Sequence, residues 1–329
     1  DTKGEALALR ALAHLNIVLV YSKAYTQGSD TDPGIPFVTS TDPDLLPIRT
    51  PLKATYDSIV NDLTMAEGLV AADNGTGRMD KAAVEGLLSR VYLFMGNWQG
   101  VVDEATKAIA DVPSENALAS ISDFPNIWTD ETEKDVLFKV RITDADDITT
   151  GVPYQQSSPS GVKPEYNIDY AFYQDYTDDD VRKSSYIGLT TFGGVQYNYI
   201  KKYAGRLSGN ANVVDAKVIR MGEIYLNRAE AYYMLNQPTD ALADLNTLRA
   251  NRYANFDPAT ATETGTDLYN AILLQRRLEL AFEGFRFFDL KRLGLPVNRS
   301  NYGDNADGSG LPATVQSLPA GSDLFSLPI

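Results

Sequence analysis

The sequence predicts a mainly α-helical protein in which tetratricopeptide-like helix pairs form an α superhelix, interrupted by a small strand-and-loop insertion. Two segments, 80–113 and 215–249, have the length and residue spacing of a helix-turn-helix repeat unit. Strand-like and loop-like sequence separates them, so the units are not in tandem. The expected organisation is one domain with helical repeats at 1–113 and 213–294, an insertion at about 114–212 and an irregular tail at 295–329.

The N-terminal part has the pattern of two helices joined by a proline-rich loop. Within 4–21, apolar residues recur every three or four positions, which is the spacing of a helix with one packed face. Five prolines between positions 33 and 51 then break the chain into a loop. A second helix is expected over about 53–71, ended by the glycine-containing segment 73–77.

The two repeat units carry similar residues at corresponding places. In 80–113 these are Tyr92, Gly96, Trp98, Ala108 and Pro113, and in 215–249 they are Ala231, Tyr232, Asn236, Ala241 and Leu248. Large aromatic side chains next to such turns are usually buried. Trp98 at the repeat turn and Trp128 after segment 124–126 are therefore expected to be packing residues. His14 lies in an apolar helical run and is expected to pack as well.

The insertion has the alternation expected of strands. Within 134–142, Val136, Phe138, Val140 and Ile142 are spaced two apart, which predicts a strand with one buried face. Segment 195–203 alternates similarly, and it predicts strand-core positions for Tyr197, Tyr199 and Tyr203. The sequence between the two segments is rich in glycine, proline, serine, aspartate and tyrosine.

Composition excludes several kinds of function. A net charge of −15 argues against nucleic acid, because phosphate binding requires clustered lysine and arginine. The chain has no cysteine and a single histidine, so thiolate chemistry, Ser-His-Asp triads and histidine-rich metal sites are not expected. The acidic loop 301–310 has oxygen ligands suited to calcium, but its spacing differs from an EF-hand. No metal site, cofactor or membrane-spanning run of about 20 apolar residues is expected.

The apolar segment 276–294, RRLELAFEGFRFFDLKRLG, contains an unusual number of charges. On one long helix from Asp267 to Leu293, four charged side chains would form a single stripe, and they are Arg276, Glu279, Glu283 and Arg286. A pair of carboxylates at this spacing could act as the acid and base of a glycosidase. Arginines within one turn lower carboxylate pKa values, whereas a general acid needs a raised pKa. The stripe therefore predicts a structural ion network with no catalytic residue, and Gly284 is expected to permit close contact with another helix.

The same segment resembles the C-terminal signature of the SusD/RagB family of outer-membrane nutrient-binding lipoproteins. The family pattern R-x-x-E-L-x-x-E-G-x-R-x-x-D-L-x-R-x-G matches at ten positions, from Arg276 to Gly294. Segments 4–25 and 218–252 resemble two helical parts of the family. Segments 134–142 and 178–182 resemble its middle strand and its Asp-x-Arg turn.

The resemblance implies a surface receptor without enzymatic activity. Members capture oligosaccharides, or peptides in some cases, and cap a TonB-dependent, SusC-like transporter at the extracellular face of the outer membrane. They are usually longer, beginning with a lipidated cysteine and continuing beyond the counterpart of residues 327–329. The sequence is therefore expected to be part of a longer, lipid-anchored protein.

The tyrosine-rich insertion offers the groups that sugars need, because aromatic faces contact pyranose C–H groups and amides bind hydroxyls. The candidate ligand-binding residues are Tyr154, Gln155, Tyr166, Asn167, Tyr170, Phe172 and Tyr173. An ordinary packed turn is the alternative for Tyr170, Phe172 and Tyr173. Two other functions remain open: a helical-repeat scaffold that binds a peptide or protein, and a glycoside hydrolase that uses paired carboxylates.

Overall fold

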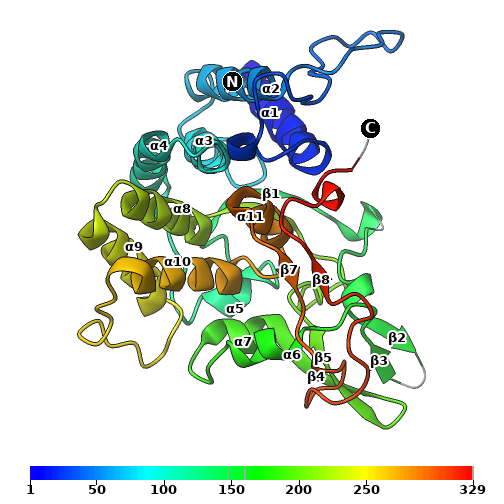
Figure 1. The fold of residues 1–329 in the computed structure, drawn as a ribbon. Helices are drawn as coiled ribbons and strands as arrows, with labels where there is room; N and C mark the ends of the chain where they lie inside the picture. The colour runs from blue at the N-terminus through cyan, green and yellow to red at the C-terminus, as the bar shows by residue number, and fades with distance from the viewer. Residues whose placement is uncertain (147, 159–160, 328–329) are drawn as a thin grey trace.

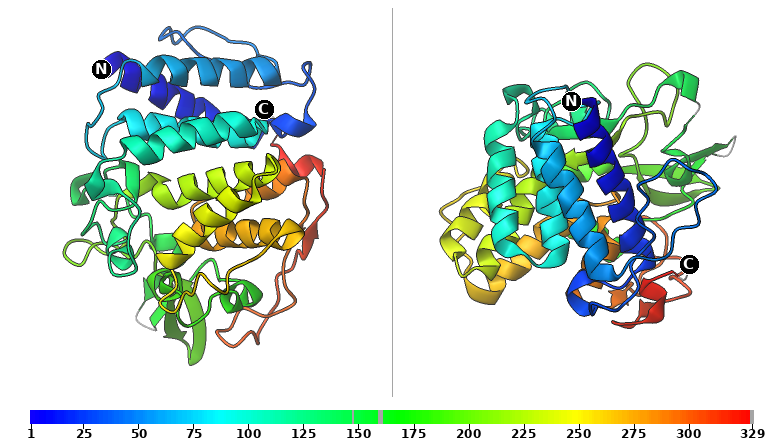
Figure 2. Two further views of the ribbon diagram at one scale, coloured as in Figure 1. Left: turned by 90° about the vertical axis from the view of Figure 1, so that its left-hand side faces the viewer. Right: turned by 90° about the horizontal axis from the view of Figure 1, so that it is seen from above.

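The computed structural model describes residues 1–146, 148–158 and 161–327; the end of the predicted tail, 328–329, lies outside the described residues. Its principal helices are α1 (Thr2–Tyr21), α2 (Leu52–Glu67), α3 (Lys81–Met95), α4 (Trp98–Asp111), α8 (Met221–Met234), α9 (Pro238–Ala250), α10 (Gly265–Glu279) and α11 (Phe285–Leu293). These helices stack in successive layers, from α1 and α2 through α3 and α8 to α10 (Figure 1; Figure 2, left). The predicted helical architecture is confirmed.

Shorter elements lie beneath α10 and to the right of the stack in Figure 1. The insertion contains α5 (Phe124–Ile127), β1 (Val136–Val140), β2 (Gln156–Ser158), β3 (Gly161–Lys163), α6 (Tyr170–Gln174), α7 (Val181–Tyr186), β4 (Ile187–Phe192), β5 (Val195–Ile200) and β6 (Ala216–Arg220), and the tail adds β7 (Val297–Asn298) and β8 (Ser317–Leu318). Each strand pairs with one antiparallel partner: β1 with β6, β2 with β3, β4 with β5, and β7 with β8.

The first repeat unit is bounded by its own capping residues. The Asp80 side chain accepts a hydrogen bond from the Ala83 N–H at 2.9 Å and begins α3. Gly96 ends α3 with a φ of 70°, and the Asn97 side chain then caps α4. The helix pair predicted for 80–113 is therefore confirmed.

The second repeat unit begins later than the sequence pattern indicated. Helices α8 and α9 form the expected pair, with Asn236 in the left-handed region, at a φ of 58°, in the turn between them. Residues 216–220 are not helical; they form β6, which pairs with β1. The prediction that this unit starts at 215 was wrong, because β-branched Val218 and Ile219 lie on a strand that β1 completes.

The strand β1 does not have the single buried face predicted for it. Leu137 and Lys139 are buried, whereas Val140 is 51% exposed. The pairing with β6 shifts register on either side of Phe138. Such irregularities change which way side chains point, which explains why the period-two pattern failed here.

In β5 the buried side chains are Asn198 and Ile200, while Tyr197 and Tyr199 are half-buried. The expectation of strand-core positions for these tyrosines was wrong. Asn198 is buried because the tail loop covers it, and its Nδ2 donates a hydrogen bond to the Ala306 carbonyl of that loop at 3.0 Å. This contact also positions the tail against the insertion.

The predicted helix from Asp267 to Leu293 is broken into α10 and α11. Phe282 has a φ of 67° and Gly284 a φ of 85°, both in the left-handed region. A Cβ at Gly284 would have nothing within 4 Å, so close helix contact is not the reason for this glycine. Gly284 instead supplies the positive φ at which α11 begins.

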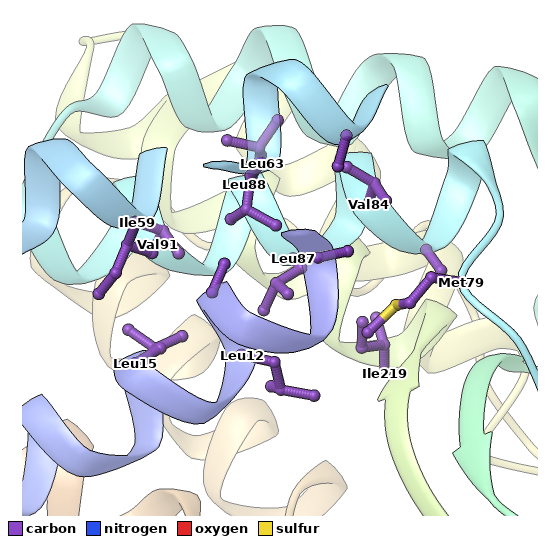
Figure 3. Packing of buried hydrophobic residues seen from close by; sticks show 14 of the residues in the cluster. Leu12, Leu15, Ile59, Leu63, Met79, Val84, Leu87, Leu88, Val91 and Ile219 are labelled. Carbon is purple, nitrogen blue, oxygen red and sulfur yellow. The ribbon is translucent and has the colours of Figure 1, made fainter. Parts of the chain in front are cut away.

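The main hydrophobic core lies between α1, α2, α3 and β6, and Figure 3 shows Leu15, Ile59, Leu87 and Ile219 within it. Helix α1 is long and apolar enough to cross a membrane by length and composition, but most of it is buried in this core. Here His14 accepts a hydrogen bond from the Val38 N–H at its Nε2 and stacks on Phe37, as expected of a packing residue.

A second core cluster lies between the insertion and the end of α10. Trp128, 4% exposed, packs there against Phe124 and Tyr186, as predicted. Trp98 is half-buried against a small cluster between α3, α4 and α8, which also agrees with a packing role.

Helix α3 buries one carboxyl group that has no hydrogen-bond partner among the described residues. The Glu85 side chain is fully buried, and its oxygens make no hydrogen bond within the described chain. The nearest cation, Lys81 Nζ, is 3.6 Å away and also pairs with Asp111. Burial raises the pKa of Glu85 to about 8. Because the folded-state pKa exceeds the unfolded value, folding stability falls as pH rises from the unfolded pKa through about 8.

When the pH is raised from about 5 to about 9, we expect the free energy of unfolding to fall less for Glu85→Gln than for the wild-type protein. The reason is that glutamine does not ionise. Thermal unfolding at both pH values measures the difference. Glu115→Gln, at an exposed glutamate, is the matched control and should follow the wild-type curve. Equal pH dependence for Glu85→Gln and the wild-type protein would contradict the proposed burial of this carboxyl group.

Candidate ligand-binding site

The break between α10 and α11 is supported by hydrogen bonds from the insertion. Four hydrogen bonds join an insertion side chain to a backbone carbonyl near the break: Tyr176 Oη to Leu278, Tyr186 Oη to Glu279, Lys202 Nζ to Ala281, and Tyr203 Oη to Phe282, at 2.8–2.9 Å. The last carbonyls of a helix have no partner within the helix and must be satisfied elsewhere. Tyr176 and Tyr186 therefore satisfy the last carbonyls of α10, while Lys202 and Tyr203 hold the segment after it. These side chains have a structural role that the sequence pattern did not reveal.

The carboxylate of Glu279 lies at the centre of the charged cluster beside this break. It accepts hydrogen bonds from Arg252 at 2.9 and 3.0 Å, from Arg220 at 3.0 Å and from Arg182 at 3.3 Å. All four side chains are essentially inaccessible to solvent. Burial alone would raise the pKa of Glu279, but the charges of Arg252 and Arg220 outweigh it and hold the pKa well below its usual value.

The second glutamate of the stripe is held in a similar way. Glu283 contacts Arg220 at 2.6 and 2.9 Å and Lys202 Nζ at 2.8 Å. These cations outweigh the effect of burial, so the pKa of Glu283 is also lowered. Both carboxyl groups are therefore held in the ionised form, which suits ion pairing and opposes a role as a proton donor.

The four residues of the predicted stripe do not form one network. Arg276 pairs with Asp289 at 2.9 Å, apart from the Glu279 cluster. Arg286 is exposed and makes no ion pair within the described residues, so its assignment to the network was wrong. The break after α10 explains both differences, because α11 does not continue the helical phase of α10.

Most partners of the glutamates were missed by the sequence analysis. Arg220 and Arg252 lie far along the chain, and Lys202 belongs to the insertion. Only the Asp180-x-Arg182 turn gave a signal, and these two side chains pair at 2.8 Å next to Glu279.

The predicted ligand residues fall into two groups. In the first group, Tyr154 stacks on Tyr203 with ring centroids 5.6 Å apart and lies 6.3 Å from the ring of Tyr166, which is 59% exposed. Gln155 Nε2 donates to Asn212 Oδ1 at 2.5 Å, and Asn167 is exposed nearby in sequence. Tyr154 also borders a hollow of about 370 Å³ whose lining includes Tyr203, Phe282 and Glu283.

The second group lies on α6. Tyr170 stacks on Tyr173 with a centroid separation of 5.9 Å and meets the ring of Tyr302 edge-on at 5.1 Å. Tyr302 is 47% exposed and was not among the predicted residues. The tail loop that carries it is held against α6, because the Ser300 N–H donates to Asp169 at 2.9 Å. No local pattern joins positions 170 and 302, so sequence spacing could not have found this pair.

Phe172 differs from its neighbours on α6. Its side chain is only 9% exposed, and its ring packs against Tyr176 and Phe282. Phe172 is therefore a packing residue, as the alternative interpretation of this turn expected, and its ring is not available to a ligand.

Comparison with known proteins gives a consistent picture. Residues 120–313 match the family model described as SusD family, and residues 1–93 match a model described as starch-binding and associating with the outer membrane. The SusD-like protein P2 of Formosa agariphila is 26% identical over 75% of this chain. The chain spans 57% of the length of that curated relative.

Solved structures show the same fold. A SusD superfamily protein from Bacteroides thetaiotaomicron matches with a TM-score of 0.82 at 25% identity, covering 99% of this chain and 74% of that chain. A SusD-like carbohydrate binding protein from Bacteroides vulgatus matches with a TM-score of 0.81 at 24% identity, covering 99% and 74%.

We expect Glu279→Gln to lower the free energy of unfolding by about 3–5 kcal/mol, because it leaves buried guanidinium groups without their central counter-ion. Urea unfolding measures the change. Arg286→Gln is the matched control on the same segment and should alter stability by less than about 0.5 kcal/mol. A Glu279→Gln protein as stable as the control would show that this carboxylate does not hold the cluster together.

Proposed function

The chain belongs to the SusD family, and from this premise we propose that it is a non-catalytic protein that captures oligosaccharides through half-buried and exposed tyrosines of its insertion and tail. The observation that carries the proposal is a pair of tyrosine groups, one on the insertion and one where the tail loop meets α6. Tyr154 and Tyr166 form one group, and Tyr170, Tyr173 and Tyr302 form the other.

The chemistry of these groups supports binding of sugars. Exposed tyrosine rings offer an apolar face for pyranose C–H groups together with a hydroxyl that donates or accepts hydrogen bonds. Gln155 and Asn167 add amide groups beside Tyr154 and Tyr166. The carbohydrate-binding description of the similar protein from Bacteroides vulgatus supports the same class of ligand.

The ionised state of Glu279 and Glu283 supports a role without catalysis. Glycoside hydrolysis needs one carboxyl group that is protonated near neutral pH, and the arginines beside these two groups favour the opposite state. A helical-repeat scaffold for peptides is the alternative, and it predicts binding that does not depend on the exposed tyrosines.

The proposal extends to location and partner. The family description matched by residues 1–93 includes association with the outer membrane, which supports placement there. We further propose that the full-length protein is lipid-anchored at the extracellular face. There it would deliver oligosaccharides to a SusC-like, TonB-dependent transporter. Co-purification of this chain with a SusC-like transporter from the cells that produce it would test the partnership.

A panel of polysaccharides in affinity gels tests the ligand class. We expect retardation by at least one polysaccharide, without release of reducing ends. Replacing Tyr154 and Tyr166 together by alanine, or Tyr170 and Tyr302 together, should weaken that binding about tenfold or more, because each exposed ring contributes about 1 kcal/mol or more of contact energy.

Tyr233→Ala provides the control for these variants. Tyr233 stacks on Tyr269 at 4.9 Å on the helical side of the molecule, so its loss should leave sugar binding unchanged. Unaltered binding in both tyrosine double variants would contradict the proposed surface. Release of reducing ends that Glu283→Gln abolishes would instead identify a hydrolase.

A further inference from the structure

Buried cations in this protein follow a consistent pattern. Eight buried lysines and arginines of the described chain each contact a carboxylate: Arg90, Lys139, Arg182, Lys202, Arg220, Arg252, Arg276 and Arg292. Such pairing is expected, because moving an unpaired charge out of water is costly. Within the described residues, Lys291 is the exception, since it is 6% exposed and has no carboxylate partner.

Lys291 makes contacts that explain part of its burial. Its Nζ donates to the carbonyls of Leu19 at 2.7 Å and Ser22 at 2.5 Å, at the C-terminal end of α1. The helix dipole favours a cation at this position. These neutral oxygens offset the charge only partly, and burial lowers the pKa of Lys291 to about 8. A negative charge nearby would stabilise the ammonium group further.

Lys291 borders a cavity of about 640 Å³, which is larger than the hollow beside Tyr154. The end of α1 with the segment that follows it, the end of α11 and tail residues 321–327 form most of its lining, and it is open to solvent on one side. Its volume lies within the range of about 300–1,000 Å³ typical of small-molecule sites. The cavity is therefore large enough for a ligand and has a buried cation in its wall.

A second cation lines the same cavity. Arg49 donates from Nε to the Gly34 carbonyl at 2.7 Å and from Nη2 to the Tyr21 carbonyl at 3.1 Å, but it has no carboxylate partner within the described chain. Ser22 also lines the cavity, and its buried hydroxyl lacks a hydrogen-bond partner among the described residues. Lysine, arginine and hydroxyl groups together suit a carboxylate ligand.

The remaining walls are largely apolar, and they are formed by Leu290, Leu295, Leu324, Phe325 and Leu327. Such side chains can pack against the C–H face of a sugar ring. The net charge of −15 opposes the approach of multiply charged anions, so a ligand with a single negative charge is favoured.

We propose that this cavity is a second binding site, distinct from the tyrosine groups, that takes a uronic acid unit with its carboxylate towards Lys291 and Arg49. The choice of a sugar acid rests on the proposed function. The site itself rests on the unpaired cations and the cavity.

Isothermal titration with D-glucuronate, and with D-glucose as the neutral counterpart, tests the site. We expect glucuronate to bind and glucose to bind at least about tenfold more weakly, because it lacks the charge. Leu324→Trp should weaken glucuronate binding about tenfold or more by filling the cavity. Leu324 is 71% exposed, so the larger side chain should not disturb folding. Leu311→Trp, at an 80% exposed leucine outside the cavity lining, is the matched control and should bind normally.

Charge provides an independent readout. Asp323 is the carboxylate that lines the cavity, and it lies on the exposed tail. Asp323→Asn should tighten glucuronate binding about two- to fivefold at low salt, because it removes a repelling charge. Weaker or unchanged binding in this variant would contradict recognition of an anion at this site.

Three results would overturn the proposal: equal binding of glucose and glucuronate, glucuronate binding that Leu324→Trp does not weaken, or acetate binding as tightly as glucuronate. The last result would indicate a site for any small carboxylate and not for a sugar acid. Replacing Tyr154 and Tyr166 by alanine should leave glucuronate binding unchanged. Failure of the tyrosine surface and failure of the cavity can therefore be told apart.

Discussion

The carboxylate of Glu279 is buried where α10 ends, and it can remain ionised there only because three guanidinium groups surround it. Each of these groups comes from a different part of the chain: Arg182 from α7, Arg220 from the end of β6 and Arg252 from the segment after α9. Because the Glu279 carboxylate needs all three counter-ions, it connects the insertion to both helical parts of the chain. The Gly222 position shows how close this packing is, since a Cβ there would lie 2.4 Å from a Glu279 oxygen.

The end of α10 also divides the tyrosines of the insertion by role. Tyr176, Tyr186 and Tyr203 point inward and satisfy backbone carbonyls around the helix break. Tyr154 stacks on Tyr203, whose hydroxyl is held by the Phe282 carbonyl, so this part of the candidate ligand surface has a fixed support. A binding surface with little freedom to move loses less entropy when a ligand is bound. The hydrogen bond from Tyr203 to the Phe282 carbonyl at the helix break thus helps to position Tyr154 in the proposed sugar-binding face.

The sequence predicted features that depend on neighbouring residues and missed those that depend on distant ones. Helix α1 followed from apolar spacing, and the α3–α4 pair followed from the length and residue pattern of its repeat unit. The break at Phe282 did not, because a bulky residue at positive φ is unfavourable locally and is held there by tertiary contacts. The glutamates of the ion network were recognisable, whereas Arg220 and Arg252 needed the fold to bring them together. Among the candidate ligand residues, exposure separated Tyr166 from Phe172, and one sequence does not determine exposure.

We propose that the insertion and the helical parts form one domain that unfolds as a unit, since both depend on the same buried charges. Native-state hydrogen exchange tests this claim most directly by comparing the amides of the α10–α11 break with those of α7 and β6. The account predicts that these amides exchange with the same free energy of opening, equal to that of global unfolding. Exchange of α7 and β6 through a much cheaper local opening, while α10 stays protected, would contradict it.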